Sequence, residues 1–294
     1  MKTRTGIAGI FAGLMAINGN LYSQRLFSGD HEIGLSGSAG MSALLFSPVD
    51  GSQPSYSAGY AVGWDIAFMF SERWAFRTGV NMASYHSAYS SDLLETRNLT
   101  ANPTEIPDGN FYLETGYRGY EEQYEALYLL FPLMAQYRIP VGAIHHFYAA
   151  GGVNAGIRTN DACRIRSGDV VTKGYSEYTM QYYEELPGHG FDTYRNVRSA
   201  DKLDFGFALS GALETGMMWR INNGMALYTG IFLDYGFNDL RKGNPKKESI
   251  VYDEYGAHTF NSILHSQNDG SPMTGKVHPL AVGIRLRWSM LFIR

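Results

Sequence analysis

Seven charged residues lie at alternate positions of otherwise apolar segments and are the first candidates for chemistry. They are Asp65, Arg77, Arg138, Glu214, Asp234, Arg285 and Arg287. Residues two apart on a β-strand share a face, so one carboxylate could bridge Arg285 and Arg287 through bidentate hydrogen bonds. Asp234 is the nearest partner for them in the expected strand order, and Glu214 lies one strand farther away.

Such a cluster has two interpretations. It could form a path for ions or protons, or it could be an internal salt-bridge network that fills and rigidifies a closed barrel. Charges in a narrow, poorly hydrated interior must be paired or hydrogen-bonded. We therefore favour the structural network.

Ser84, His86 and Ser87 are spaced so that they could support nucleophilic catalysis. That chemistry needs an acid behind the histidine, and no spacing in the sequence indicates one. His145 and His146 are adjacent, so on a strand they point to opposite faces and cannot chelate one metal together. We predict that the chain is not an enzyme and that it holds no metal and no cofactor.

The segments that position these residues alternate between large apolar and small or polar side chains. Tyr56–Phe70 shows this period of two over fifteen residues, and His278–Phe292 repeats it near the C-terminus. The alternation indicates β-strands with two different environments, and both are much longer than the usual five or six residues. Long strands of this kind are typical of transmembrane β-barrels.

Side-chain volume indicates which face points outward. The interior of an eight-stranded barrel is just wide enough to be filled by side chains, so it cannot take the tryptophans and other aromatic rings of these strands. Gly, Ala, Ser and a few charges fit inside, which leaves Trp, Phe, Leu and Ile outside. A contiguous apolar surface of that size would aggregate in water, so the outside must be lipid.

Composition agrees with an exported membrane barrel. The 294 residues include 34 Gly, 21 Tyr and 16 Phe, and mean hydropathy is only −0.21, as expected when apolar residues alternate. The net charge of −4 and the lack of a basic stripe argue against a nucleic-acid partner. Residues 1–23 resemble a signal peptide, with cleavage near Ser23 and Gln24. Cys163, the one cysteine, cannot form an internal disulfide, and we expect it to be a bystander in a loop.

The pattern predicts an all-β, antiparallel transmembrane barrel in a domain covering residues 24–294. Eight strands are expected, at Ile33–Leu45, Tyr56–Phe70, Trp74–Ser87, Ala126–Arg138, His146–Arg158, Lys202–Ile221, Met225–Asn238 and Lys276–Phe292. Ten strands are the alternative, because Asn110–Gln123 or Tyr175–Glu185 could pair as β-extensions above the membrane.

The expected connections alternate between short and long. Tight turns are expected at residues 71–73 and 222–224, with another short connection at residues 139–145. Long loops are expected at Ala88–Glu125, Thr159–Asp201 and Asp239–Gly275. Short turns on one side and long extracellular loops on the other are typical of outer-membrane barrels, and an even strand number places both termini in the periplasm.

Two segments carry a resemblance to a known family. Leu127–Arg138 (LYLLFPLMAQYR) resembles a strand of the PorT-like outer-membrane β-barrel family, in which an apolar–proline–leucine run ends in a KYR-like or QYR-like tripeptide. Phe147–Asn154 (FYAAGGVN) is similar to the next strand of that family. The resemblance implies an outer-membrane barrel of Bacteroidetes-type bacteria, and it implies no particular reaction. Arg294 departs from the terminal aromatic residue of other such barrels, with Phe292 two positions earlier.

The expected loops are the candidate recognition surface. Tyr175, Tyr178, Tyr182 and Tyr183 could contact a protein or glycan, or could simply lie in the headgroup belt. The basic residues of Asp239–Gly275 could bind lipopolysaccharide phosphates or could be solvated. We therefore predict a non-catalytic outer-membrane scaffold whose partners are lipid, lipopolysaccharide and another envelope protein or glycan. The alternatives are a narrow solute or ion pore and a lipid-modifying enzyme.

Overall fold

The computed structural model describes residues 30–48, 54–101, 110–142, 144–186, 191–243, 245, 247–251 and 259–292. The expected signal peptide at residues 1–23 lies outside this range. No helix within the described residues is long and apolar enough to span a bilayer.

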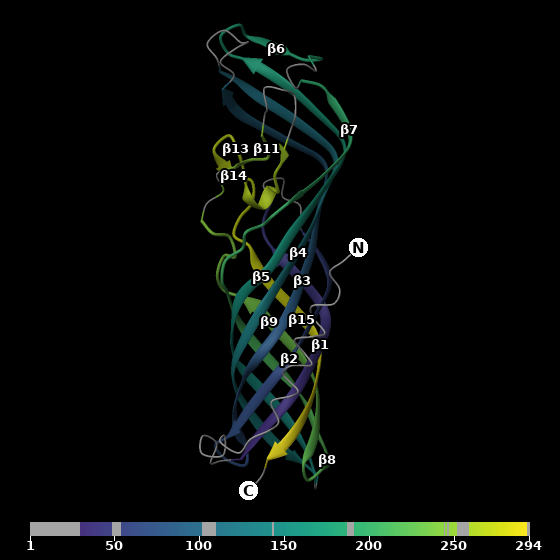
Figure 1. Cartoon of the computed structure of the whole chain (residues 1–294), viewed down its shortest axis with the longest axis vertical. Coiled ribbons are helices and arrows are strands. Elements are labelled where there is room, and N and C mark those ends of the chain that lie inside the picture. Colours follow the sequence, from purple (N-terminus) through teal and green to yellow (C-terminus); the bar gives the residue numbers. More distant parts are fainter. Residues whose placement is uncertain are drawn as a thin grey trace, which may run out of the picture.

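Eight antiparallel strands close into a ring, which confirms the predicted fold class (Figure 1). Each strand pairs with its neighbours along the chain, and β1 pairs with β15 to close the barrel. The strands of the ring are β1 (His31–Leu45), β2 (Ser55–Met69), β3 (Trp74–Ala101), β4 (Asn110–Val141), β5 (His145–Ser176), β8 (Ala208–Asn222), β9 (Met225–Gly236) and β15 (His278–Phe292).

The two faces of the strands have the predicted environments. Outward side chains such as Trp64, Ile231 and Ile284 form an exposed apolar band, whereas their small or charged neighbours face the interior. Gly40 on β1 and Gly283 on β15 lie directly opposite each other, and a Cβ on either would collide with the backbone of the other strand. Small inward residues therefore permit the close strand approach of a narrow barrel.

Three strands are far longer than the sequence predicted. β3 has 28 residues, and β4 and β5 have 32 each, so the expected loops Ala88–Glu125 and Thr159–Asp201 are largely strand. We call the part of β3, β4 and β5 beyond the apolar band the extension; it covers residues 89–101, 110–125 and 159–176. β7 (Thr193–Asp201) and β6 (Gln181–Tyr183) pair with β5 at its edge. The expected strand Lys202–Ile221 begins only at Ala208, because residues 202–207 are irregular.

A line of irregular residues crosses the extension. Gly119 on β4 and Asn196 on β7 have positive φ angles of 61° and 52°, and the strand registers skip a position at the same level. The register is unchanged on either side of this line, but the buried, inward phase of the strands moves by one residue across it. Figure 1 shows the long strands bending beside β7.

The connection between β9 and β15 folds against the inner side of the extension. It contains β10 (Lys247–Glu248), β11 (Ile250–Val251), β12 (Thr259–Phe260), the 3₁₀ helix η3 (Ile263–His265), β13 (Ser266–Asn268) and β14 (Ser271–Pro272). We call residues 259–277 the plug. Ile263 and Leu264 are fully buried in one cluster with Tyr120, Tyr124 and Phe205. Asp239–Gly275 is thus a long connection as expected, but its part within the plug is buried and not a solvated surface loop.

The plug also covers the free edge of β3. Asn268 accepts a hydrogen bond from the backbone N–H of Arg97 at 2.7 Å, and the N–H of Asp269 donates to the Arg97 carbonyl at 2.9 Å. An unpaired strand edge is a site for unwanted pairing with other chains. The plug and β7 thus protect opposite edges of the extension.

Candidate functional site

A charged network occupies the barrel interior. Arg77 on β3 forms a two-point ion pair with Glu214 on β8, and both side chains are almost completely buried. Arg285 on β15 donates to the second oxygen of Glu214 at 3.0 Å and lies 3.6 Å from Asp234. The hydroxyl of Tyr148 donates to Glu214 at 2.8 Å. Glu214 is therefore the anion at the centre of this network.

A second group lies nearer the short-turn end of the lumen. Arg138 pairs with Glu32 at 2.8 Å, and the hydroxyl of Tyr228 donates to the same carboxylate at 2.7 Å. Arg287 donates to Gln136 at 3.0 Å and stacks over the Tyr228 ring, with its guanidinium carbon 3.8 Å from the ring centroid. Cation–π stacking of this kind adds to the stability of a desolvated arginine.

The structure places all seven sequence-derived charges in the lumen. Asp65, the one of the seven not yet described, is buried in the lumen. The observed pairing differs from the expected one in two respects. Glu214, not Asp234, makes the shorter contact with Arg285, and Arg287 binds the Gln136 amide oxygen. Side chains meet across a narrow lumen as well as between neighbouring strands, which the strand order alone does not reveal.

Glu32 is a member of the network that the sequence prediction missed. It lies in the small, inward phase of β1, two residues before Gly34 and four before Ser36. The predicted strand began at Ile33 and so excluded it. Extending the alternation by one residue would have found it.

The lumen is closed above this network. A cavity of about 30 Å³ beside Tyr85, Asp234 and Arg285 has room for about one water molecule. Tyr85 lines the cavity, Tyr128 packs edge-on against Tyr85, and both belong to the same apolar cluster as the plug residues Ile263 and Leu264. Barrel interior and plug therefore form one continuous packed core.

Glu122 fastens the plug to the extension. Its carboxylate accepts hydrogen bonds from the Ser262 hydroxyl at 2.6 Å and from the Ile263 backbone N–H at 2.8 Å, and also from the Tyr120 hydroxyl. Burial raises the pKa of Glu122, although these hydrogen bonds oppose the shift.

Cys163 lies behind the plug and is fully buried, so it is not the loop bystander that the sequence suggested. Its thiol donates to Glu122 at 3.4 Å. Burial raises the pKa of this thiol well above its usual range, and the nearby Glu122 carboxylate acts in the same direction. A buried thiol of this kind is unreactive while the plug is docked.

Ser84, His86 and Ser87 do not form a catalytic relay. Ser84 lies 3.3 Å from Nδ1 and 3.4 Å from Nε2 of His86, but Nδ1 also lies 3.1 Å from the Ala58 carbonyl. Glu125 is the acid that the sequence could not indicate, and it lies 3.8 Å from Nε2. Nδ1, the ring nitrogen nearer Ser84, faces the Ala58 carbonyl and therefore has to donate there, so it cannot also accept the serine proton.

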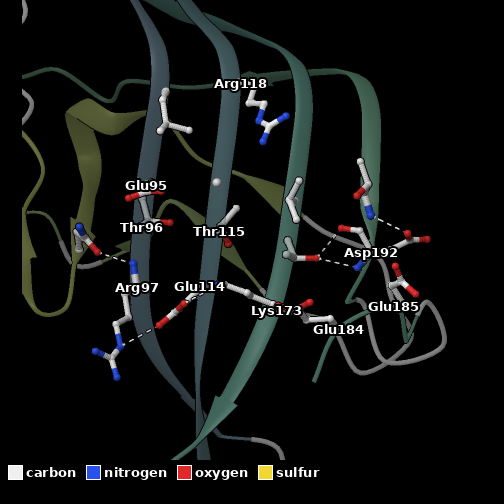
Figure 2. A pocket seen from close by; sticks show the side chains of 16 residues that line it. Glu95, Thr96, Arg97, Glu114, Thr115, Arg118, Lys173, Glu184, Glu185 and Asp192 are labelled. Carbon is white, nitrogen blue, oxygen red and sulfur yellow. Dashed lines mark hydrogen bonds and ion pairs between the residues drawn. The ribbon is translucent and has the colours of Figure 1, made fainter. Parts of the chain in front are cut away.

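A groove of about 700 Å³ lies on the extension (Figure 2). Its centre is a cross-strand row in which Glu114 pairs with Arg97 at 3.6 Å and with Lys173 at 3.4 Å. Arg97 also stacks over Tyr112, with its guanidinium carbon 4.0 Å from the ring centroid. The acidic lining residues Glu95, Glu114, Glu184, Glu185 and Asp192 outnumber the basic lining residues Arg97, Arg118 and Lys173.

The sequence-derived tyrosines lie at the far end of the extension. Tyr175 and Tyr182 contact each other with ring centroids 4.9 Å apart, and Lys173 lies over the Tyr182 ring. Tyr178 is 69% exposed, whereas Tyr183 packs partly against a small buried cluster. All four therefore lie in strand or turn positions beyond the apolar band.

The basic residues expected to meet lipid phosphates are largely paired. Arg241 donates to Asp239 at 3.0 Å, and Lys242 donates to Asp204 at 2.9 Å. Lys246 lies outside the described residues. Within the described part of the chain, no group of three or more His, Cys, Asp or Glu residues is arranged to hold a metal ion.

Sequence comparison identifies the family. The model of the outer membrane protein beta-barrel domain matches residues 22–242. The chain belongs to this family. It is therefore an integral β-barrel protein of the outer membrane. No curated protein is detectably similar in sequence.

Solved outer-membrane barrels resemble the chain at low identity. Neisserial surface protein A is 10% identical with a TM-score of 0.32, covering 88% of this chain and 96% of its own. OprG from Pseudomonas aeruginosa is 12% identical with a TM-score of 0.34, covering 91% and 98%. Ail of Yersinia pestis, solved with the heparin analogue sucrose octasulfate, is 11% identical with a TM-score of 0.28, covering 89% and 99%.

Proposed function

We propose that this outer-membrane barrel is a non-catalytic scaffold that presents its extension at the cell surface for recognition of a partner. The observation that carries the proposal is the continuation of β3, β4 and β5 as paired strands far beyond the apolar band. A rigid sheet holds side chains in fixed positions, which favours specific recognition over a flexible loop. The charged groove on this sheet is the proposed contact site.

The proposal includes an orientation. The short turns, Asp30 and Phe292 all lie at the end of the barrel opposite the extension, and we assign that end to the periplasm. Export of a chain with a leader at residues 1–23 fits this assignment. We also retain as a proposal the finer membership in the PorT-like group, which rests on Leu127–Arg138 and Phe147–Asn154.

A narrow pore is the second candidate function, and the charged lumen is the observation that favours it. Against it stand the ion pairs that fill the interior and the apolar core that continues into the plug. Conductance of the purified barrel in a planar bilayer separates the two. We expect no steady conductance, and a stable open channel would favour the pore.

Photo-crosslinking in intact cells tests recognition directly. A crosslinking amino acid at Leu93, an exposed residue lining the groove, should yield a discrete adduct, and one at Val80 in the apolar band serves as the matched control. The Leu93 adduct should disappear when Glu184 and Glu185 are changed to lysine. Identical products from Leu93 and Val80 would contradict a recognition role.

A further inference from the structure

The outer side of the extension carries five exposed arginines without ionic partners. They are Arg118 on β4, Arg164 and Arg166 on β5, and Arg195 and Arg198 on β7. We call this set the arginine face. Within the described residues, none of the five guanidinium groups has a hydrogen-bond or ion-pair partner. Other arginines of the extracellular part, such as Arg97, Arg158 and Arg241, are ion-paired.

The strand register brings these arginines together. Arg166 and Arg198 lie directly opposite each other on neighbouring strands, and Asp169 lies between Arg118 and Arg195 in the next row. The positive φ of Asn196 coincides with a one-residue change of phase, so Arg195 and Arg198 are both exposed although they are three residues apart. Like charges directly opposite each other on a sheet are destabilising unless an anion lies between them.

Nearby carboxylates do not neutralise the face. Glu121 lies opposite Arg166, but its carboxylate accepts a hydrogen bond from Gln123 at 2.7 Å. Asp169 has no described cation within ion-pair distance.

Arg118 also lines the acidic groove, so the positive surface lies over the other four arginines. Glu125, two residues from Gln123 on the same face of β4, is the third acid beside them. The excess of positive charge is concentrated where Arg166 and Arg198 lie opposite each other, and this fits an anionic ligand.

The height of the face above the membrane indicates which anion it meets. On β4 the last outward apolar residue is Leu127, and Arg164 lies opposite Gln123, four residues farther out. With a rise of about 3.3 Å per residue and a tilt of about 40°, the face lies roughly 10 to 20 Å above the hydrocarbon edge. A sideways-facing surface at this height meets the saccharide layer of the outer-leaflet glycolipid.

We propose that the arginine face binds phosphate groups on the saccharide of the outer-leaflet glycolipid. The guanidinium fork binds phosphate oxygens bidentately, and a phosphate between Arg166 and Arg198 would remove their repulsion. This assignment rests on the proposed function, because the face meets that leaflet only if the extension lies outside the cell. The bound glycolipid would hold the extension upright beside the membrane.

Thermal unfolding in bilayers tests the assignment. The protein is reconstituted in phosphatidylcholine bilayers with and without phosphorylated rough lipopolysaccharide, and the unfolding temperature is measured. Lipopolysaccharide should raise it, and R164Q/R166Q/R198Q should lose at least half of that gain. The control R73Q/K247Q/K276Q removes the same charge from exposed residues elsewhere and should keep the gain. A triple-arginine variant that gains as much as the native protein would overturn the assignment.

Two further arms identify the ligand. The first arm uses lipopolysaccharide treated with phosphatase. It should raise the unfolding temperature of the native protein no more than that of the triple-arginine variant. An undiminished rise in the native protein would overturn the phosphate assignment. Free polyglutamate that abolishes the gain would indicate an acidic protein partner and would also overturn it. The proposed orientation is tested separately by labelling S91C and N223C in intact cells, because vesicles with lipopolysaccharide in both leaflets report phosphate binding in either orientation.

Discussion

Arg77 and Glu214 face each other across the lumen, from β3 and β8, and each oxygen of the carboxylate meets a different nitrogen of the guanidinium. The two strands are not neighbours in the ring. The ion pair therefore braces the barrel across its interior, with Arg285 and Tyr148 bound to the same carboxylate.

Glu214→Gln should strongly destabilise the barrel, because it removes the carboxylate that Arg77 and Arg285 share and leaves Arg285 with only its 3.6 Å pair to Asp234. Removing one member of a buried pair costs about 3–5 kcal/mol. Urea unfolding of the folded protein in lipid, followed by loss of gel-mobility heat modifiability, measures the change. Glu125→Gln at the partly exposed surface is the control and should shift the free energy of unfolding by less than about 1 kcal/mol. Unchanged stability with altered conductance would instead favour the pore.

Glu122→Ala should release the plug. The substitution leaves the Tyr120 and Ser262 hydroxyls and the Ile263 N–H without their acceptor, at a cost on the order of 3 kcal/mol. Cys163 is a natural reporter because it is buried behind the plug, so the rate of thiol labelling should rise on the order of 100-fold.

Glu121→Ala is the matched control for that experiment. Glu121 is the preceding residue and points to the outer face, where it binds Gln123 and not the plug. Its loss should leave Cys163 labelling within about threefold of the native rate. Equal labelling of the two variants would show that Glu122 does not hold the plug.

The barrel was predictable from sequence because alternation persists over whole strands. Tyr56–Phe70 and His278–Phe292 needed no tertiary information, since lipid outside and a narrow lumen inside impose the same pattern on every strand. The predicted ends at Leu45 and Phe292 match the observed ends of β1 and β15. The inward positions of the seven charges followed from the same parity.

The extension and plug were not predictable in the same way. The outer face of the extension is polar, its inner face is buried against the plug, and the alternation changes phase near Gly119 and Asn196, so its strands looked like loops. The plug is short and irregular, and only its packing on Tyr120 and Tyr124 buries Ile263 and Leu264. Contacts between distant segments of this kind leave no periodic signal in the sequence.

Plug docking should depend on pH through His265, whose pKa is lowered by burial. His265 therefore binds a proton less readily when the plug is docked than when the plug is released. The stabilisation is fully present above the ordinary histidine pKa of about 6.5 and is lost as pH falls through the lowered value. Asp201 opposes this shift, and Arg241 and Lys247 add to it.

The ratio of Cys163 labelling in the native protein to that in His265→Phe should therefore rise as pH falls from 7.5 to 5. Phe keeps the ring that lies 6.0 Å from Phe205 but cannot be protonated. Glu122, with its raised pKa, acts in the opposite direction, and the ratio cancels its contribution because both proteins contain it. Labelling with 4,4′-dithiodipyridine, which reacts with thiols at acid pH, measures it. A ratio that stays constant would exclude His265 as the source of any acid release.

Glu114→Gln should separate recognition from stability at the groove. The ion pairs of Glu114 with Arg97 and Lys173 are partly exposed, so their loss should change the free energy of unfolding by less than about 1 kcal/mol. The same change frees two cations at the centre of the proposed contact site and should alter the yield of the Leu93 crosslink. Gln123→Ala, on the same face of β4 but outside the groove, is the control. A crosslink yield that follows unfolding stability in both variants would mean that Glu114 acts only through the fold.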